Sequence, residues 1–115
     1  MNLEKNSNAL MREVASRLKK LADFGPMIDG SVVVIHRRCG KPGCRCADGE
    51  KHPATHLTRK VGKKNEAIYI PAELVEEVRI WQQEHQRLKK LVSEICERQR
   101  MVVKLIIAER RRKGL

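Results

Sequence analysis

Aromatic side chains are scarce in this 115-residue chain, where Phe24, Tyr69 and Trp81 together make up 3% of the residues. A compact globule of this length usually draws on more aromatic residues for its core. Aliphatic residues are plentiful, because hydrophobic residues as a whole reach 41%, too many for a disordered polyampholyte. We therefore expect stability to come from packing between Leu-, Val- and Ile-rich helices, within one chain or between chains.

Long apolar runs are missing as well. The N-terminus has no apolar stretch of the signal-peptide kind, and no run approaches the length needed to cross a bilayer. We therefore expect a cytoplasmic protein with no membrane partner, in which the four cysteines stay reduced. No G-x-S-x-G, phosphate-loop, H-E-x-x-H or paired-carboxylate pattern occurs, and we predict no enzymatic activity.

Acidic residues are few beside basic ones: 14 Asp and Glu against 25 Lys and Arg give a net charge of +11. The excess lies in two zones. Residues 37–64 hold nine basic and two acidic residues, a net of +7, and residues 98–115 hold seven and one, a net of +6. Between them, residues 65–97 have a net charge of −3. Separate basic zones favour an anionic partner at defined places, nucleic acid before membrane, over a basic protein without a specific partner.

The apolar pattern predicts an α+β fold in three parts. Leucine and valine at helical spacing predict an N-terminal helix over residues 3–24, ended by Gly25 and Pro26, within a first part that spans residues 1–30. In residues 31–70, "SVVVIHRR", "THLTRKV" and "EAIYI" predict a small three-stranded antiparallel sheet with a zinc-binding loop at one end and "GKKN" as a tight turn. Residues 71–115 form a long coiled-coil-like helix that Pro71 opens and that ends in a basic segment.

The long helix carries a heptad seam whose residues step by four and three, with His85 and Gln99 as polar, register-setting interruptions. A helix from residue 71 to about 112 would be roughly 60 Å long, more than the sheet can cover. The seam is therefore expected to pair with the first helix, with another copy of the chain, or with both. We predict a homo-oligomer, most simply a dimer, and a wider apolar face after Ile95 indicates more than one neighbour. The predicted interface residues are Leu74, Val78, Trp81, Leu88, Val92, Ile95, Val102 and Ile106.

The stretch "HRRCGKPGCRCADGEKHPATH" (36–56) gathers three of the four cysteines in a Gly- and Pro-containing loop. Cys39, Cys44 and Cys46 offer three thiolates, and one histidine would complete a tetrahedral Zn²⁺ site. His52 is expected within the loop and is preferred to His56, which is expected on the second strand; His36 ranks third. The alternatives are a redox disulfide, a catalytic thiol and unliganded cysteines. Cys96, on the long helix, is expected to be a buried small hydrophobe.

Together these features predict a non-enzymatic, zinc-stabilised nucleic-acid-binding protein, with DNA expected before RNA. Few aromatic or neutral base-reading residues are present, so affinity should exceed sequence specificity. The alternatives are a coiled-coil scaffold or adaptor that binds a protein partner without nucleic acid, and a thiol redox sensor. The residues predicted to contact phosphates are Arg37, Arg38, Lys41, Arg45, Arg59, Lys60, Lys63 and Lys64.

Residues of about 30 to 92 also resemble a family of small uncharacterised prokaryotic proteins. The resemblance rests on a strand ending in R-R-C-G-K-x-x-C-x-C, a His-Pro segment, a hairpin, and "P-x-E-L" at the start of a long helix. It implies the architecture described above and no established activity, together with an association with mobile elements. Where members of the family tend to place aromatic residues after the His-Pro segment, this chain has Ala54, Thr55 and His56.

Overall fold

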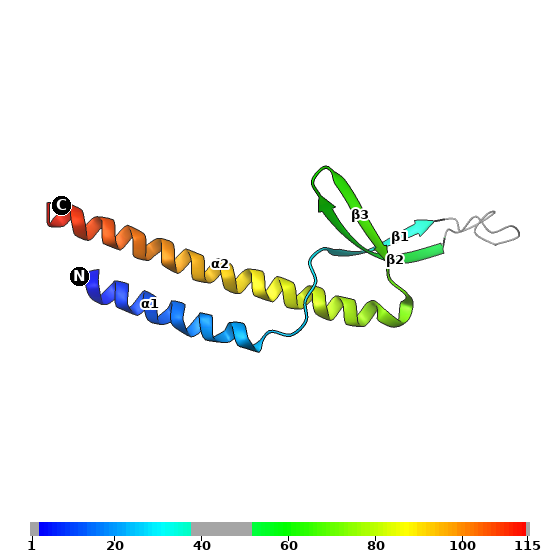
Figure 1. Ribbon diagram of the computed structural model, residues 1–115, viewed down its shortest axis with the longest axis horizontal. Coiled ribbons are helices and arrows are strands. Elements are labelled where there is room, and N and C mark those ends of the chain that lie inside the picture. The colour runs from blue at the N-terminus through cyan, green and yellow to red at the C-terminus, as the bar shows by residue number, and fades with distance from the viewer. Residues whose placement is uncertain (1–2, 38–51, 115) are drawn as a thin grey trace, which may run out of the picture. The chain divides into compact units, whose positions relative to one another are not determined.

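The computed structural model describes residues 3–37 and 52–114 and has the predicted α+β architecture (Figure 1). The elements are α1 (Leu3–Lys19), the 3₁₀ turn η1 (Lys20–Asp23), β1 (Ser31–Arg37), β2 (His52–Val61), β3 (Lys64–Tyr69), the 3₁₀ turn η3 (Ala72–Leu74) and α2 (Val75–Arg112). The chain folds into two compact units, residues 1–25 with 86–115 and residues 26–85, and the continuous helix α2 contributes to both. No helix in the described ranges is long and apolar enough to span a membrane.

Two boundaries differ from the prediction. The last turn of the N-terminal helix is 3₁₀, and the chain becomes extended at Phe24. The region expected to be loop up to residue 54 is shorter, because β2 begins at His52 and includes Pro53. Proline is tolerated there since β3 pairs only with residues 56–61 of β2, which leaves one side of β2 without a partner strand at Pro53.

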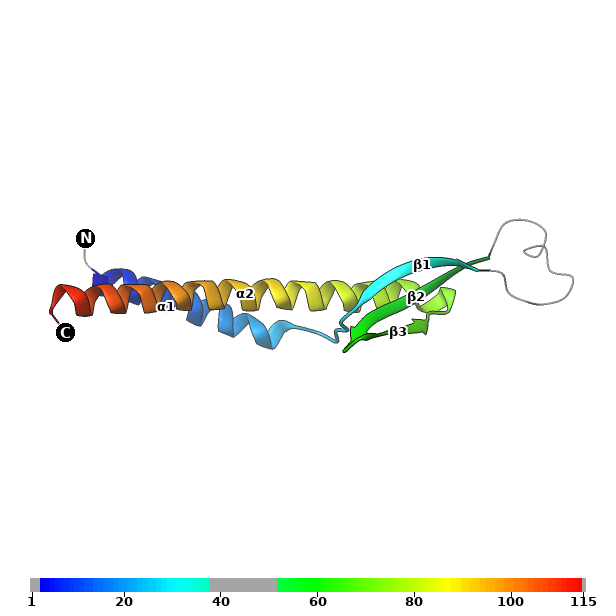
Figure 2. The same ribbon diagram turned by 90° about the horizontal axis from the view of Figure 1, so that it is seen from above.

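The sheet is antiparallel with strand order β1-β2-β3 (Figures 1 and 2). In the register, Val32 pairs with Leu57, and Leu57 pairs with Ile68. Leu57 joins Ile70 and Val78 in a buried cluster, against which residues of the connector, β1 and the first turns of α2 pack: Ile28, Val32, Val75 and Trp81. The face of the sheet that carries Leu57 is therefore the one that packs on the start of α2.

Two hydrogen bonds tie the connector before β1 to α2. The backbone N–H of Ile28 donates to the carbonyl of Trp81 at 3.1 Å, and the Gln82 side-chain amide donates to the carbonyl of Gly30 at 2.9 Å. Gly30 has φ +121°, and a Cβ at this position would lie 2.7 Å from the backbone oxygen of Thr58. Only glycine fits this close approach between the start of β1 and β2.

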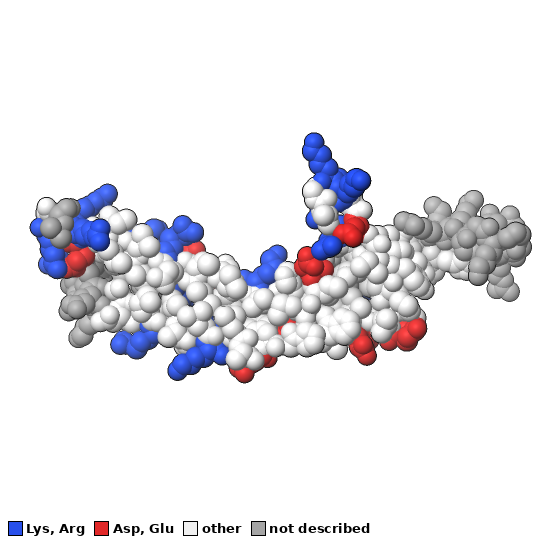
Figure 3. Space-filling view, viewed as in Figure 1, with Lys and Arg blue, Asp and Glu red and all other residues white. Residues whose placement is uncertain are grey.

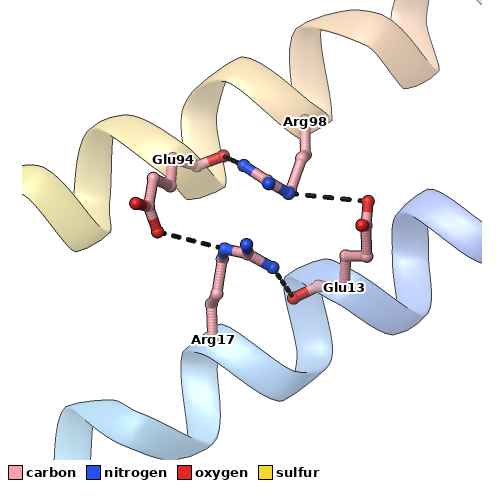
Figure 4. A network of polar contacts seen from close by, with 4 residues as sticks. All are labelled: Glu13, Arg17, Glu94 and Arg98. Atoms are coloured by element: carbon pink, nitrogen blue, oxygen red, sulfur yellow. Dashed lines mark hydrogen bonds and ion pairs between the residues drawn. The ribbon is translucent and has the colours of Figure 1, made fainter.

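In the other unit, α1 and the C-terminal part of α2 form an antiparallel helical hairpin (Figure 1). Val14 of α1 and Leu91 and Val102 of α2 are its buried residues. Polar contacts join the two helices beside them (Figure 4). Arg17 Nε lies 3.2 Å from a Glu94 carboxylate oxygen and Arg98 Nε lies 3.5 Å from a Glu13 oxygen, while each guanidinium also donates to a main-chain carbonyl four residues earlier in its own helix: Arg17 to Glu13 at 3.2 Å and Arg98 to Glu94 at 3.1 Å.

A second apolar stripe runs along this hairpin without a covering element among the described residues. It comprises five side chains that are each 43% to 50% exposed, and we call it the outer stripe: Met11 and Leu18 on α1, and Val92, Val103 and Ile106 on α2. An α-helix turns by about 100° per residue. The outer stripe is therefore rotated to one side of Val14 and Val102, and the four ion-pair residues are rotated to the other, so the two sets lie on opposite faces.

The expectation that Cys96 is buried is wrong, because Cys96 is exposed. The sequence showed a broad apolar arc after Ile95, and α1 covers only the part of it that contains Val102. Cys96 lies beyond that part, next to the outer stripe, and Gln99 falls within the stripe.

Candidate nucleic-acid interface

The β2–β3 hairpin projects a group of cations from the sheet (Figure 3). Its two-residue connection is Gly62-Lys63, closed by the pair Val61 and Lys64. Gly62 has φ +62°, whereas no non-glycine residue of the described chain has a positive φ, so the loop follows the pattern of a type II′ turn with glycine first. This tight turn brings Lys60, Lys63 and Lys64, all exposed, to one end of the sheet.

The single acidic residue of the described strands is neutralised locally. Glu66 lies opposite Arg59 in the ladder and accepts a hydrogen bond from Arg59 Nε at 2.9 Å. Both side chains are about half exposed, so the pair contributes little to stability, but it occupies one cation and the one carboxylate together. No carboxylate of the described residues pairs with Lys60, Lys63 or Lys64. The hairpin therefore carries three cations without a described counterion.

Alternation along the strands separates these charges by face. Arg59 and Glu66 share the Leu57 face, where they line a pocket of about 210 Å³ together with Asp29. Lys60 and its ladder partner Asn65 are on the opposite face, which carries no carboxylate among the described strand residues. A polyanion would thus meet carboxylates on one face of the hairpin and none on the other.

The predicted metal ligands divide between described and undescribed residues. Cys39, Cys44 and Cys46 lie in residues 38–51, outside the described ranges, as do Arg38, Lys41 and Arg45. His52 is exposed and is the first residue of β2, in the ladder rather than in the loop where we expected it. It pairs with Arg37, the last residue of β1, so the cysteine segment begins and ends at one rung of the ladder. Within residues 3–37 and 52–114, no group of three or more His, Cys, Asp or Glu side chains could hold a metal.

His56, the second choice as metal ligand, is engaged inside the sheet. It is 9% exposed, its ring meets the Tyr69 ring edge-on with centroids 5.8 Å apart, and its Nδ1 lies 3.3 Å from the carbonyl oxygen of Ala54. His36, the third choice, is exposed near the end of β1.

Tyr69 is the residue that sequence reasoning missed. Strand alternation predicts which face of β3 carries Tyr69, but it does not predict whether another part of the chain covers that face.

The residues of the predicted seam are distributed over both units. Val78 and Trp81 pack against the sheet, Val102 is buried in the helical hairpin, and Leu88 and Ile95 are partly buried. Leu74, Val92 and Ile106 remain exposed. Leu91, which was not in the predicted seam, is buried instead of its neighbour Val92.

The basic C-terminus makes local contacts. Arg112 and Lys113 lie 3.0 Å and 3.3 Å from the Glu109 carboxylate. The hydrogen bonds from Arg112 and Lys113 lower the pKa of Glu109. Arg110, Arg111 and Arg112 also occupy the last turn, where positive charge offsets the helix dipole. Stabilisation of the helix end thus accounts for at least part of this basic zone.

Comparison with known proteins gives one match. A family model described as a domain of unknown function (DUF6788) matches residues 9–80, which include most of α1, the sheet and the start of α2. No curated protein and no solved structure matches the chain. The comparison is consistent with the uncharacterised family expected from the sequence, and it assigns no activity.

Proposed function

The chain belongs to the DUF6788 family of domains of unknown function, and we propose that it is a non-enzymatic, zinc-stabilised cytoplasmic protein that binds nucleic acid. The observation that carries the proposal is the charge arrangement of the β2–β3 hairpin. Lys60, Lys63 and Lys64 are exposed around a two-residue turn, and the only described strand carboxylate is paired with Arg59. DNA is our first choice of ligand, and an accessory role for a mobile element is the context we propose.

Clustered lysines bind a polyanion by displacing its condensed counterions, which makes the affinity depend steeply on salt. The hairpin suits this mode of binding, because three ammonium groups at one end of a sheet contact phosphates without reading base edges. Of the other predicted phosphate contacts, Arg59 is paired with Glu66. Four belong to the end of β1 and the cysteine segment: Arg37, Arg38, Lys41 and Arg45. They extend the proposal to the other end of the sheet.

We propose that a zinc ion stabilises this end of the sheet, where β1 ends and β2 begins. Three thiolates and one imidazole form a donor set that Zn²⁺ takes in structural sites. The described part fits, since His52 is exposed at the rung where the cysteine segment begins and ends. Cys39, Cys44, Cys46 and His52 would hold the ion, and its role would be to stabilise the fold rather than to catalyse a reaction.

We also propose that the protein is a homodimer, assembled through the outer stripe. A helical hairpin with three buried apolar residues has little core of its own, and amphipathic helices need a further layer on their uncovered faces. Two copies related by a twofold axis would cover both outer stripes and form a four-helix bundle. The stripe offers apolar residues from both helices, as such a bundle requires.

The same stripe favours the second candidate function, a scaffold that binds a helix of another protein without nucleic acid. One experiment separates the candidates. Retardation of duplex and single-stranded oligonucleotides is measured with micromolar protein from low to physiological salt. Nucleic-acid binding requires retardation that weakens steeply with salt, and no retardation at low salt would leave the scaffold function.

A further inference from the structure

Tyr69 is the one aromatic residue of the chain that is exposed. It is 61% exposed at the end of β3, whereas Phe24 and Trp81 are partly buried. The guanidinium of Arg87 lies 4.0 Å from the centroid of the Phe24 ring, and Trp81 packs against the cluster around Leu57. Of the three rings, that of Tyr69 is therefore the one that a ligand can reach.

The Tyr69 face of the hairpin is defined by three rungs of the ladder. His56 pairs with Tyr69, Thr58 with Ala67, and Lys60 with Asn65. Leu57, Arg59 and their partners alternate to the opposite face, which packs on α2 near the core and carries Glu66 and Asp29 along its pocket. Among the described strand residues, the Tyr69 face therefore carries no carboxylate, and it is the face opposite the one that packs on α2.

Three features make this face suitable for an unstacked base. The Tyr69 ring packs edge-on against the buried His56 ring, and this contact reduces the side-chain freedom that would be lost on binding. The middle rung has the short side chains of Thr58 and Ala67, which leave the space beside the ring open. At the far rung, four residues or about 14 Å along the strand, exposed Lys60 and Asn65 offer an ammonium and an amide.

We infer that Tyr69 is a stacking platform for a base of single-stranded nucleic acid, whose backbone runs along the Tyr69 face to Lys60. The inference rests on the proposed nucleic-acid binding and specifies the ligand as single-stranded. A base within a duplex cannot leave its stack without a cost in free energy, whereas the bases of single strands stack readily on exposed aromatic rings. The ring discriminates single strands from duplex, and the lysines supply the salt-dependent part of the affinity. Asn65, the ladder partner of Lys60, would contact the sugar or base next to the phosphate that Lys60 binds.

The test compares Tyr69→Ala with the full-length protein on labelled oligo-dT, oligo-U and a duplex of equal length, by fluorescence anisotropy at one low salt concentration. Loss of one stacked base lowers single-strand affinity about tenfold. Duplex affinity should not change. Unchanged duplex affinity of Tyr69→Ala excludes a folding defect as the cause, and Tyr69→Phe, which keeps the ring, should retain single-strand affinity. Ile68→Ala is the matched control, since Ile68 is 59% exposed on the opposite face.

The outcomes distinguish the stacking role of Tyr69 from the proposed nucleic-acid binding as a whole. If wild-type protein binds single strands and Tyr69→Ala binds them equally well, the stacking role is overturned and the proposed function stands. An equal loss on duplex and single strands also overturns the stacking role. If wild-type protein binds none of the three probes, the proposed function fails as well. Comparison of oligo-dT with oligo-U shows whether the site takes DNA, RNA or both.

Discussion

Arg17 on α1 and Glu94 on α2, 77 positions apart, form an ion pair of 3.2 Å, and Glu13 and Arg98 form its near mirror at 3.5 Å. The two helices share the pattern L-x-x-E-[VI]-x-x-R, at residues 10–17 and 91–98. Because the helices are antiparallel, the Glu of each pattern meets the Arg of the other (Figure 4). Both ion pairs can form together only when α1 and α2 are antiparallel and in this register.

This reciprocity predicts a rescue by charge exchange. Arg17→Glu would place three carboxylates together beside Arg98, and we expect it to lower the free energy of unfolding by about 1–2 kcal/mol, since the Arg17 side chain is largely shielded from solvent. The double variant Arg17→Glu/Glu94→Arg restores an ion pair and should recover at least half of the loss. Urea unfolding measures both. Arg12→Glu, at an exposed position of the same helix, should change the free energy by less than about 0.5 kcal/mol, and an equal effect there would remove the specific role of the pair.

The glycines of the sheet give a second prediction. Gly30→Ala combines a φ of +121° with a clash against a backbone oxygen, and we expect a loss of about 2–3 kcal/mol in the free energy of unfolding. Gly62→Ala adds strain at φ +62° but meets no atom within 4 Å, so its cost should be about 1 kcal/mol. Thermal and urea unfolding of the two variants should rank them in this order. The reverse order would show that the contact between Gly30 and Thr58 is not a tight constraint.

The sequence predicted the order and type of the elements because each has a strong local pattern. β-branched runs became the three strands, and four-and-three spacing became α2. The exact partner of each apolar residue was harder to predict, and Leu91 shows why. Leu91 and Val92 both fit an apolar arc that is wider than one neighbour covers, and the seam chosen from the sequence contained Val92. The ion pair of Arg98 could not be predicted from the long helix alone, because its partner Glu13 lies on α1.

The charge of the candidate site could be predicted from the sequence, but the face of the sheet on which each residue lies could not. The net charge of residues 37–64 indicated a polyanion partner, yet the neutralisation of Arg59 by Glu66 depends on the register of the hairpin. A shift of β3 by one residue would have placed Glu66 beside Lys60 and moved Tyr69 to the Leu57 face. The exposure of Tyr69 likewise depends on which face packs on α2, and that choice is made by tertiary contacts of Leu57.

Zinc loading gives a third prediction. Protein purified reduced and without chelators should contain one zinc per chain by elemental analysis. Cys46→Ser and His52→Ala each remove one of the four proposed ligands, so Cys46→Ser should lose the metal and His52→Ala should bind it more weakly than the wild-type protein. Cys96→Ser removes an exposed cysteine of α2 and should leave the metal content unchanged. A zinc content well below one in the wild-type protein would count decisively against the site, whereas retention of zinc by His52→Ala would reassign only the fourth ligand.

The lysines of the hairpin give a fourth prediction. Replacing Lys60, Lys63 and Lys64 together by Ala should weaken binding to all sequences alike. The slope of log affinity against log salt should flatten by about 2–3, given slopes of about 0.7 to 0.9 per phosphate contact. Replacing Lys19, Lys89 and Lys90, which are exposed in the other unit, removes the same charge and serves as the control. An equal effect of both triple variants would mean that net charge, rather than the hairpin, determines binding.

The assembly gives the last prediction, and two adjacent residues test it. Val92 belongs to the outer stripe, whereas Ser93 is exposed one helical step away from it. In the proposed dimer, Val92→Asp buries a charge between four helices, which is strongly unfavourable, while Ser93→Asp leaves its charge in water. Light scattering at micromolar concentration should therefore give twice the chain mass of 13.2 kDa for the wild-type protein and for Ser93→Asp, and 13.2 kDa or unfolded protein for Val92→Asp. A wild-type monomer would leave the outer stripe without a second copy, and it would then be the surface on which the scaffold function binds a partner helix.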